Sequence, residues 1–346
     1  MSIRKNPLYQ AISRYEQIPL LAALLVICAF LTFATGGLFI TSGNLLNILR
    51  VSSIELIAAL GMTVALLAGQ VDLSIGSLLA VVGVTSITVF NMTGSVALAV
   101  LAGVAVGIVV GSTNGFLVTR IAINSLIATL GMMAILRGIG YLSTNARAVQ
   151  TEGQTFQWLG TGYVGPIPVP IIIAALVLVF VYFLLNRTVF GRYVYAVGGN
   201  PDAARSAGLP VRRIYMWAFV IVAVTAAISG LITAGRLNSF QPTIGLGFEL
   251  SVIAAVILGG TRLTGGEGTV SGTVLGVLIL GVLANGLVLL DVNTFWQDVV
   301  RGSVIILAVA IDEYRKRSQA ARFQEESVEE RSQGTEQQAG SQGRAG

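Results

Sequence analysis

The feature that most constrains this chain is the length of its uncharged stretches. No Asp, Glu, Lys or Arg occurs at the 33 positions from 17 to 49, the 47 from 73 to 119, or the 34 from 153 to 186. A helix crosses the hydrocarbon core of a bilayer with about 20 residues, so each stretch can hold at least one span. Only 11% of the 346 residues are charged, against about 25% in soluble domains. The sequence therefore predicts an all-α polytopic membrane protein.

The apolar runs predict about ten transmembrane helices within a transmembrane domain of residues 18–313. The expected spans are 18–40, 48–69, 74–90, 95–118, 123–143, 166–186, 214–235, 248–260, 270–290 and 295–311. The eighth is short for a full crossing. The first is too long for a removable signal peptide and is expected to remain as an anchor.

The positions of the basic residues predict the orientation. With the N-terminus in the cytoplasm, 16 of the 21 Lys and Arg residues fall on the cytoplasmic side and three fall outside. The positive-inside rule therefore places both termini, 1–17 and 314–346, in the cytoplasm. The segment 314–346 is rich in Gln, Glu, Ser and Gly and is expected to be disordered.

The residue inventory excludes several kinds of chemistry. The chain has no His, so His-based acid–base catalysis and Ser-His-Asp triads are excluded. Its two lysines, Lys5 and Lys316, do not end a GxxxxGK[ST] phosphate loop. We therefore expect no catalytic residue, no metal site and no cofactor in this chain. The basic residues are scattered along predicted membrane edges, so we do not expect a nucleic-acid partner.

Glycines recur at helical spacing in two of the predicted spans. They stand at positions 103, 107, 111 and 115, and again at 272 and 276. Small residues four apart share one helix face and let two membrane helices approach closely. Ordinary packing within the subunit is the favoured interpretation, and an oligomer or sliding interface is the alternative.

Two glycine-interrupted segments, 68–76 and 259–268, each follow an apolar run that begins with Glu-Leu. Interrupted hydrophobic segments in two halves of a membrane protein point toward a translocation path. Asp72 and Ser74 stand where a helix would begin, so they either cap it or line the path. The candidate path residues are Gln70, Asp72, Ser74, Asn114 and Asn285.

The longest internal loop, residues 187–213, contains signals for a short helix. Asn200 suits the N-cap, Pro201 the first turn, and Gly208 the left-handed stop. A helix of about seven residues is marginal in water. It must therefore rest on its own membrane domain or on a cytoplasmic partner, and the residues alone leave both open.

Four stretches carry a resemblance to a known family. They are Gly61-Met62-Thr63 through Gln70–Ser77, Ala128–Met133 with Leu136-Arg137-Gly138, Gly191-Arg192-Tyr193 through Gly198-Gly199-Asn200 with Ala203-Ala204-Arg205, and Ala254–Thr261 with Gly265-Gly266. Over most of residues 40–315 the chain resembles the membrane-spanning subunits of ATP-binding-cassette importers, in the branch of ribose-type and other monosaccharide permeases.

The resemblance implies a type II importer bundle with broken helices in the bacterial inner membrane, translocating a monosaccharide. It implies that the internal loop couples to an ATPase through Gly198, Gly199, Asn200, Pro201, Ala203, Ala204, Arg205 and Gly208. The implied partners are an ATP-binding subunit with two fused nucleotide-binding domains, which holds ATP and Mg, an extracytoplasmic sugar-binding protein, and a second permease copy or a paralogue.

Two alternatives remain at this point. One is a branched-chain amino-acid permease of the same superfamily, whose zwitterionic substrate would favour fixed charges over neutral polar groups. The other is a self-sufficient secondary transporter or channel, for which paired intramembrane carboxylates would be expected.

Overall fold

The computed structural model describes residues 17–237, 239–293 and eight later positions (295, 296, 299, 300, 302, 303, 306 and 310). The helices are α2 Ile18–Ala34, α3 Ser42–Leu67, α4 Ile75–Thr93, α5 Val96–Thr119, α6 Ser125–Thr144, α7 Trp158–Thr161, α8 Val169–Arg187, α9 Val189–Gly199, α10 Pro201–Ser206, α11 Val211–Arg236, α12 Phe248–Leu258 and α13 Val270–Leu289. Four two-residue strands accompany them: β1 Val149–Gln150, β2 Tyr163–Val164, β3 Ile167–Pro168 and β4 Ser239–Phe240.

The all-α polytopic fold is confirmed. Within the described residues, seven helices are long and apolar enough to cross a membrane, and α2 and α12 are shorter apolar helices. The short α12 matches the expected short eighth span. The expected span at 295–311 lies largely outside the described residues, as do the terminal segments 1–16 and 314–346.

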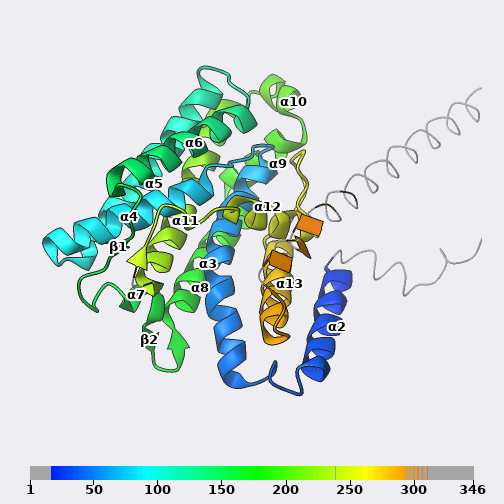
Figure 1. The fold of residues 1–346 in the computed structure, drawn as a ribbon. Helices are drawn as coiled ribbons and strands as arrows, with labels where there is room; N and C mark the ends of the chain where they lie inside the picture. The colour runs from blue at the N-terminus through cyan, green and yellow to red at the C-terminus, as the bar shows by residue number, and fades with distance from the viewer. Residues whose placement is uncertain are drawn as a thin grey trace, which may run out of the picture.

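The bundle has central and peripheral helices (Figure 1). In α3, α4 and α11, 72% of the most apolar window is buried inside the subunit, against 28% in α5, α6 and α8. The helix α11 packs against α3, α4 and α5. Large apolar side chains such as Leu101, Val179 and Phe183 remain exposed on the peripheral helices, as expected where lipid replaces water.

The glycine stripe of α5 packs within the subunit, which confirms the favoured interpretation. A Cβ at Gly107 would lie 2.8 Å from Ala227 Cβ, and one at Gly111 would lie 2.7 Å from the backbone oxygen of Phe219. Gly272 and Gly276 of α13 lie against the backbone of α12 in the same way. The absent side chains let the helix backbones approach directly.

The loops divide between two ends of the bundle, as the alternation of spans requires. One end carries α9 and α10, at the top of Figure 1. The opposite end carries α7 and the short strands, where β1 pairs with β4 and β2 with β3, both antiparallel. We call these the α10 end and the strand end.

Candidate functional site

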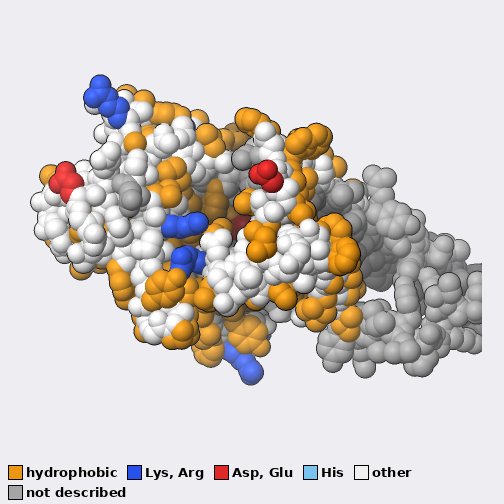
Figure 2. All heavy atoms as spheres, turned by 60° about the horizontal axis from the view of Figure 1, so that its bottom comes forward, with side chains coloured by type: hydrophobic (Ala, Val, Ile, Leu, Met, Phe, Trp, Pro, Cys, Tyr) orange, Lys and Arg blue, Asp and Glu red, His pale blue; other side chains and the backbone are white. Residues whose placement is uncertain are grey.

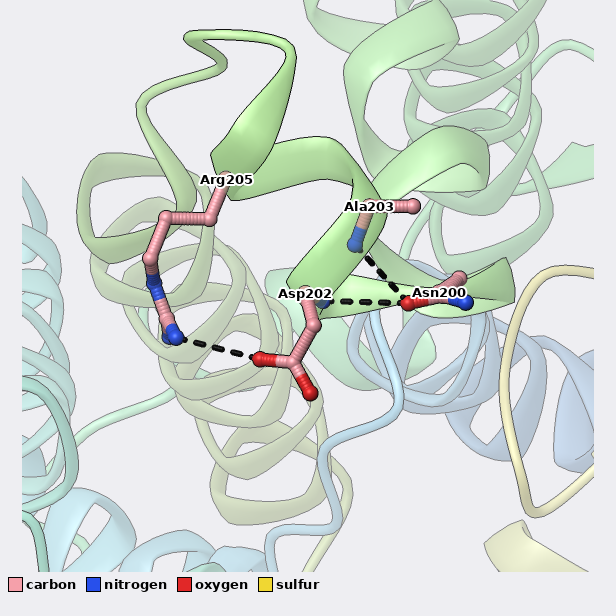
Figure 3. Close-up of polar contacts among 4 residues, drawn as sticks. All are labelled: Asn200, Asp202, Ala203 and Arg205. Atoms are coloured by element: carbon pink, nitrogen blue, oxygen red, sulfur yellow. Dashed lines mark hydrogen bonds and ion pairs between the residues drawn. The ribbon is translucent and has the colours of Figure 1, made fainter.

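The short helix expected after Asn200 is present as α10, Pro201–Ser206 (Figure 3). The Asn200 side-chain oxygen accepts hydrogen bonds from the backbone N–H of Asp202 at 3.1 Å and of Ala203 at 2.9 Å. This is an N-cap, and it satisfies donors that the first helical turn leaves without partners. Gly208 has φ +80° and ends the helix as expected.

One residue of α10 anchors it on its own membrane domain. Ala204 is 6% exposed and belongs to an apolar cluster with Val197, Val211 and Ile214. The other α10 residues are exposed, including Asp202 and Arg205, which form an ion pair at 3.1 Å. Both side chains of this pair are more than two-thirds exposed, so it adds little stability. The helix α10 therefore packs on the bundle through Ala204 and exposes its other residues to solvent.

The same loop contains a helix that the sequence did not predict. The segment before α10 forms α9, which is capped by the Thr188 hydroxyl and ends at Gly199. Its Val194, Val197 and Gly198 are buried. The loop is consequently a two-helix unit whose first helix is packed into the bundle and whose second projects from it.

Gly198 lies at a meeting point of three segments, which we call the glycine junction: Leu67 to Gly69, Gly198 to Gly199, and Gly265 to Gly266. The backbone N–H of Gly266 donates to the Leu67 carbonyl at 2.9 Å. A Cβ at Gly198 would overlap that same carbonyl oxygen, and one at Gly265 would lie 2.8 Å from Gly69 N. The two glycine-interrupted segments thus touch each other and the base of α10.

A second contact ties α9 to the α12–α13 segment. The hydroxyl of Tyr195 donates to the carbonyl oxygen of Gly268 at 3.1 Å. The backbone contacts at the glycine junction and the Tyr195 side-chain hydrogen bond therefore join α9 to both glycine-interrupted segments.

Three of the five candidate path residues form one buried network between α4 and α5. The carboxylate of Asp72 accepts from Ser74 N at 2.8 Å, Ser74 Oγ at 2.6 Å and Asn114 Nδ2 at 3.2 Å. Asn114 Nδ2 also donates to Ser74 Oγ at 3.0 Å. Burial raises the pKa of the Asp72 carboxyl, which lies in the α3–α4 loop, and these hydrogen bonds oppose part of the rise.

The Asp72 network leads to a prediction about stability. In Asp72→Asn the side-chain oxygen still accepts from Ser74, but the new amide group faces the Asn114 Nδ2 donor. Turning the Asn114 amide lets its Oδ1 accept from the new amide but breaks the Nδ2 bond to Ser74 Oγ. We therefore expect this variant to lose about 1 kcal/mol, the net contribution of one hydrogen bond. Asp72→Ala leaves buried donors unsatisfied, at about 1–3 kcal/mol each. Thermal unfolding of the purified protein in detergent measures both.

Equal losses in the two Asp72 variants would show that the carboxylate charge is needed. A smaller stability loss in Asp72→Asn than in Asp72→Ala, together with impaired uptake in Asp72→Asn, would support the path role of Asp72.

The other two candidate path residues lie apart from this network. The Gln70 side chain is hydrogen-bonded to Tyr215 of α11. Asn285 of α13 exchanges two amide hydrogen bonds with Asn44 of α3, at 2.9 and 3.0 Å. The five candidates therefore occupy three separate places, and only Asp72, Ser74 and Asn114 are brought together.

A cavity of about 300 Å³ lies toward the strand end, where α3, α4, α11 and α12 meet. It is lined by Val51, Ile54, Glu55, Leu79, Thr233, Arg236, Ile244, Gly245, Leu246, Phe248 and Ser251. Glu55 and Ser251 also line a smaller cavity of about 50 Å³ against α13. Figure 2 shows a hollow in this face, with acidic atoms in its depth and basic side chains beside it.

The path candidates chosen from the sequence line none of this cavity. Glu55 carried a usable signal, because an ionisable residue inside a span is a functional candidate by default. Thr233 and Ser251 carried no signal of function in the sequence, since single hydroxyls inside apolar runs commonly bond to their own helix. Arg236 lies one residue beyond the expected span 214–235; it is the last residue of α11 and lines the cavity.

The comparisons with known proteins agree over most of the chain. The family model described as the permease component of branched-chain amino acid transport systems matches residues 44–309. The ribose import permease protein of Escherichia coli K12 is 40% identical over 301 residues, which cover 86% of this chain and 93% of the relative.

Two further relatives have similar coverage. The L-arabinose transporter permease protein of Azospirillum brasilense is 41% identical over 86% of this chain and 89% of its own length. The ribose import permease protein of Bacillus subtilis is 42% identical over 81% and 87%. No solved structure matches the chain.

Proposed function

Since this chain belongs to the family of transport-system permease components, we propose that it is the membrane-spanning subunit of an ATP-driven importer for a monosaccharide. The observation that carries the proposal is the identity of 40% to ribose import permeases over most of both chains. The arabinose permease relatives extend the substrate class to pentoses in general. They do not favour the alternative of a branched-chain amino acid.

The proposed orientation places the α10 end in the cytoplasm, together with both termini, in a bacterial inner membrane. The excess of Lys and Arg in the loops assigned to that side supports it. The loop ends at Arg120 and at Arg212 lie beside Arg205 of α10 around a common hollow. The basic loops are therefore gathered at one end of the bundle.

In this proposal the energy comes from another polypeptide. An ATP-binding subunit with two fused nucleotide-binding domains holds ATP and Mg and docks on α10 through Asn200, Pro201, Ala203 and Arg205. A binding protein delivers the sugar to the strand end, and a second permease copy or paralogue completes the pathway. Closure of the ATPase would displace α10 and, through the glycine junction, the segments 68–74 and 259–269.

The docking role is tested in the importer reconstituted into proteoliposomes. We expect Arg205→Glu, and deletion of Asn200 and Pro201, to lower ATP-driven pentose uptake about tenfold or more, because each 1.4 kcal/mol of lost docking weakens binding tenfold. Membrane insertion should be unchanged, since the outer surface of α10 is exposed. Arg187→Glu is the matched control, with the same charge change at an exposed position in the last turn of α8.

Wild-type uptake in both α10 variants would reject the docking role. Uptake that is abolished by a protonophore but insensitive to ATP depletion would instead support a self-sufficient secondary transporter.

A further inference from the structure

The cavity at the strand end combines hydrogen-bonding groups with an apolar wall. Glu55 supplies a carboxylate, Arg236 a guanidinium, and Thr233 and Ser251 supply hydroxyls. The remaining lining is mostly apolar and includes the Phe248 ring. Ligand pockets typically enclose about 300–1,000 Å³ and place a few polar groups among apolar ones. A cavity of about 300 Å³ is at the lower end of that range and suits a small ligand.

We propose that this cavity is the monosaccharide-binding site of the subunit, an inference that rests on the proposed function. The Glu55 carboxylate accepts hydrogen bonds from sugar hydroxyls, and the Arg236 guanidinium donates to hydroxyl oxygens. The hydroxyls of Thr233 and Ser251 donate to the carbonyls of Ser229 at 2.7 Å and Gly247 at 3.3 Å, so their oxygens serve the sugar as acceptors. The apolar lining, with Phe248, covers the C–H face of the sugar ring.

The polar groups come from three helices rather than one. Glu55 lies on α3, Thr233 and Arg236 lie one turn apart on α11, and Ser251 lies on α12. A monosaccharide carries hydroxyls around its whole ring and can use donors and acceptors on several sides at once. Glu55 and Arg236 are fixed charges that would also suit a zwitterionic amino acid. The relatives named as ribose and L-arabinose permeases favour the sugar, and leucine is therefore included in the test.

The cavity is mechanically linked to the glycine junction. Glu55 is 12 residues before Leu67 on α3, about 18 Å along the helix, and Leu67 accepts the Gly266 hydrogen bond. Ser251 is seven residues before the end of α12, about 10 Å, and α12 leads directly into the segment 259–269. Helix α3, which ends at the junction, and helix α12, which leads into the segment that reaches it, therefore both carry cavity residues. In this proposal a displaced α10 changes the shape of the site.

The test uses thiol accessibility, because the chain has a single cysteine. Cys28→Ser provides the cysteine-free background, and Thr233→Cys places a thiol in the half-buried wall of the cavity. Ser239→Cys is the control, at an exposed position of β4 at the same end but outside the lining. The complete importer in proteoliposomes is treated with a charged methanethiosulfonate reagent, with and without millimolar ribose, arabinose or leucine.

We expect ribose or arabinose to slow modification of Thr233→Cys at least fivefold, and to leave Ser239→Cys unchanged. Leucine should have no effect on either. Ser251→Cys repeats the test from α12 if Thr233→Cys does not assemble. A cavity thiol that never reacts would overturn the proposed site. So would a cavity thiol that reacts as fast in the presence of each sugar as in its absence.

Uptake measured in the Cys28→Ser background separates failure of the proposed binding site from failure of the proposed function. Sugar uptake without protection would reject the site alone. Uptake of leucine and of no sugar would reject the function, and protection by leucine would assign the cavity to an amino acid.

Discussion

Gly198→Ala is expected to separate α9 and α10 from the bundle and to reduce sugar uptake to background. The new Cβ would overlap the carbonyl oxygen of Leu67 and lie 2.7 Å from Gly266 N. Both neighbours are backbone atoms that already bond to each other, so neither can turn aside as a side chain would. Overpacking of this kind lowers the free energy of unfolding by about 1–3 kcal/mol and occasionally more. We expect a loss at the upper end, because the two backbone neighbours cannot move aside.

The neighbouring glycine supplies the control. A Cβ at Gly199 would meet no atom within 4 Å, so Gly199→Ala should unfold at the wild-type temperature. The measurement is thermal unfolding of the purified variants in detergent, followed by uptake in proteoliposomes. Equal unfolding temperatures for the two variants would show that the backbone approach at Gly198 is not required.

Gly111→Val is expected to prevent stable packing of α5 on α11. Its Cβ would lie 2.7 Å from the Phe219 oxygen and 2.8 Å from Ala223 Cβ and Val220 Cα. The α5–α11 contact runs along the whole glycine stripe, so a local separation also loosens Gly107 and Gly115. We expect a loss of about 3 kcal/mol or more, at or above the upper end of overpacking costs.

Gly131→Val on α6 is the matched control, because it makes the same substitution at a glycine that packs against no other helix. Gly131 is exposed on another candidate membrane span, and a Cβ there would meet nothing within 4 Å. Folded yield and unfolding temperature should therefore fall for position 111 and not for position 131. A monomer that keeps wild-type stability in Gly111→Val but no longer assembles would instead assign the stripe to an interface between subunits.

Much of the architecture was predictable because the bilayer acts on each segment separately. A span needs about 20 apolar residues whatever its neighbours are, so hydropathy located nine apolar helices of the described residues, the short α12 among them. The helix α10 was predictable for a related reason. Its cap at Asn200, its first-turn proline and its stop at Gly208 act within a few residues of chain, and each is observed.

The functional geometry was less accessible because it joins residues far apart in the chain. Asp72 was recognised as a cap or a path residue, but its bond to Asn114 spans 42 positions. Asn285 was selected as a neutral polar group, although its partner Asn44 is 241 positions away. The Thr233 hydroxyl lines the cavity and also donates to the Ser229 carbonyl one turn earlier, as hydroxyls in apolar helices commonly do, so no local pattern marks it as a cavity residue.

By itself the sequence determined which segments cross the membrane, which loops share a side, and where the projecting helix starts and stops. Those properties follow from transfer to lipid and from hydrogen bonding within single segments. Only the tertiary structure decided that Leu67, Gly198 and Gly266 meet, and that Glu55 and Ser251 share a cavity. Those contacts depend on how helices pack side by side, and one glycine or one hydroxyl in an apolar run fits many packings equally well until its neighbours are in place.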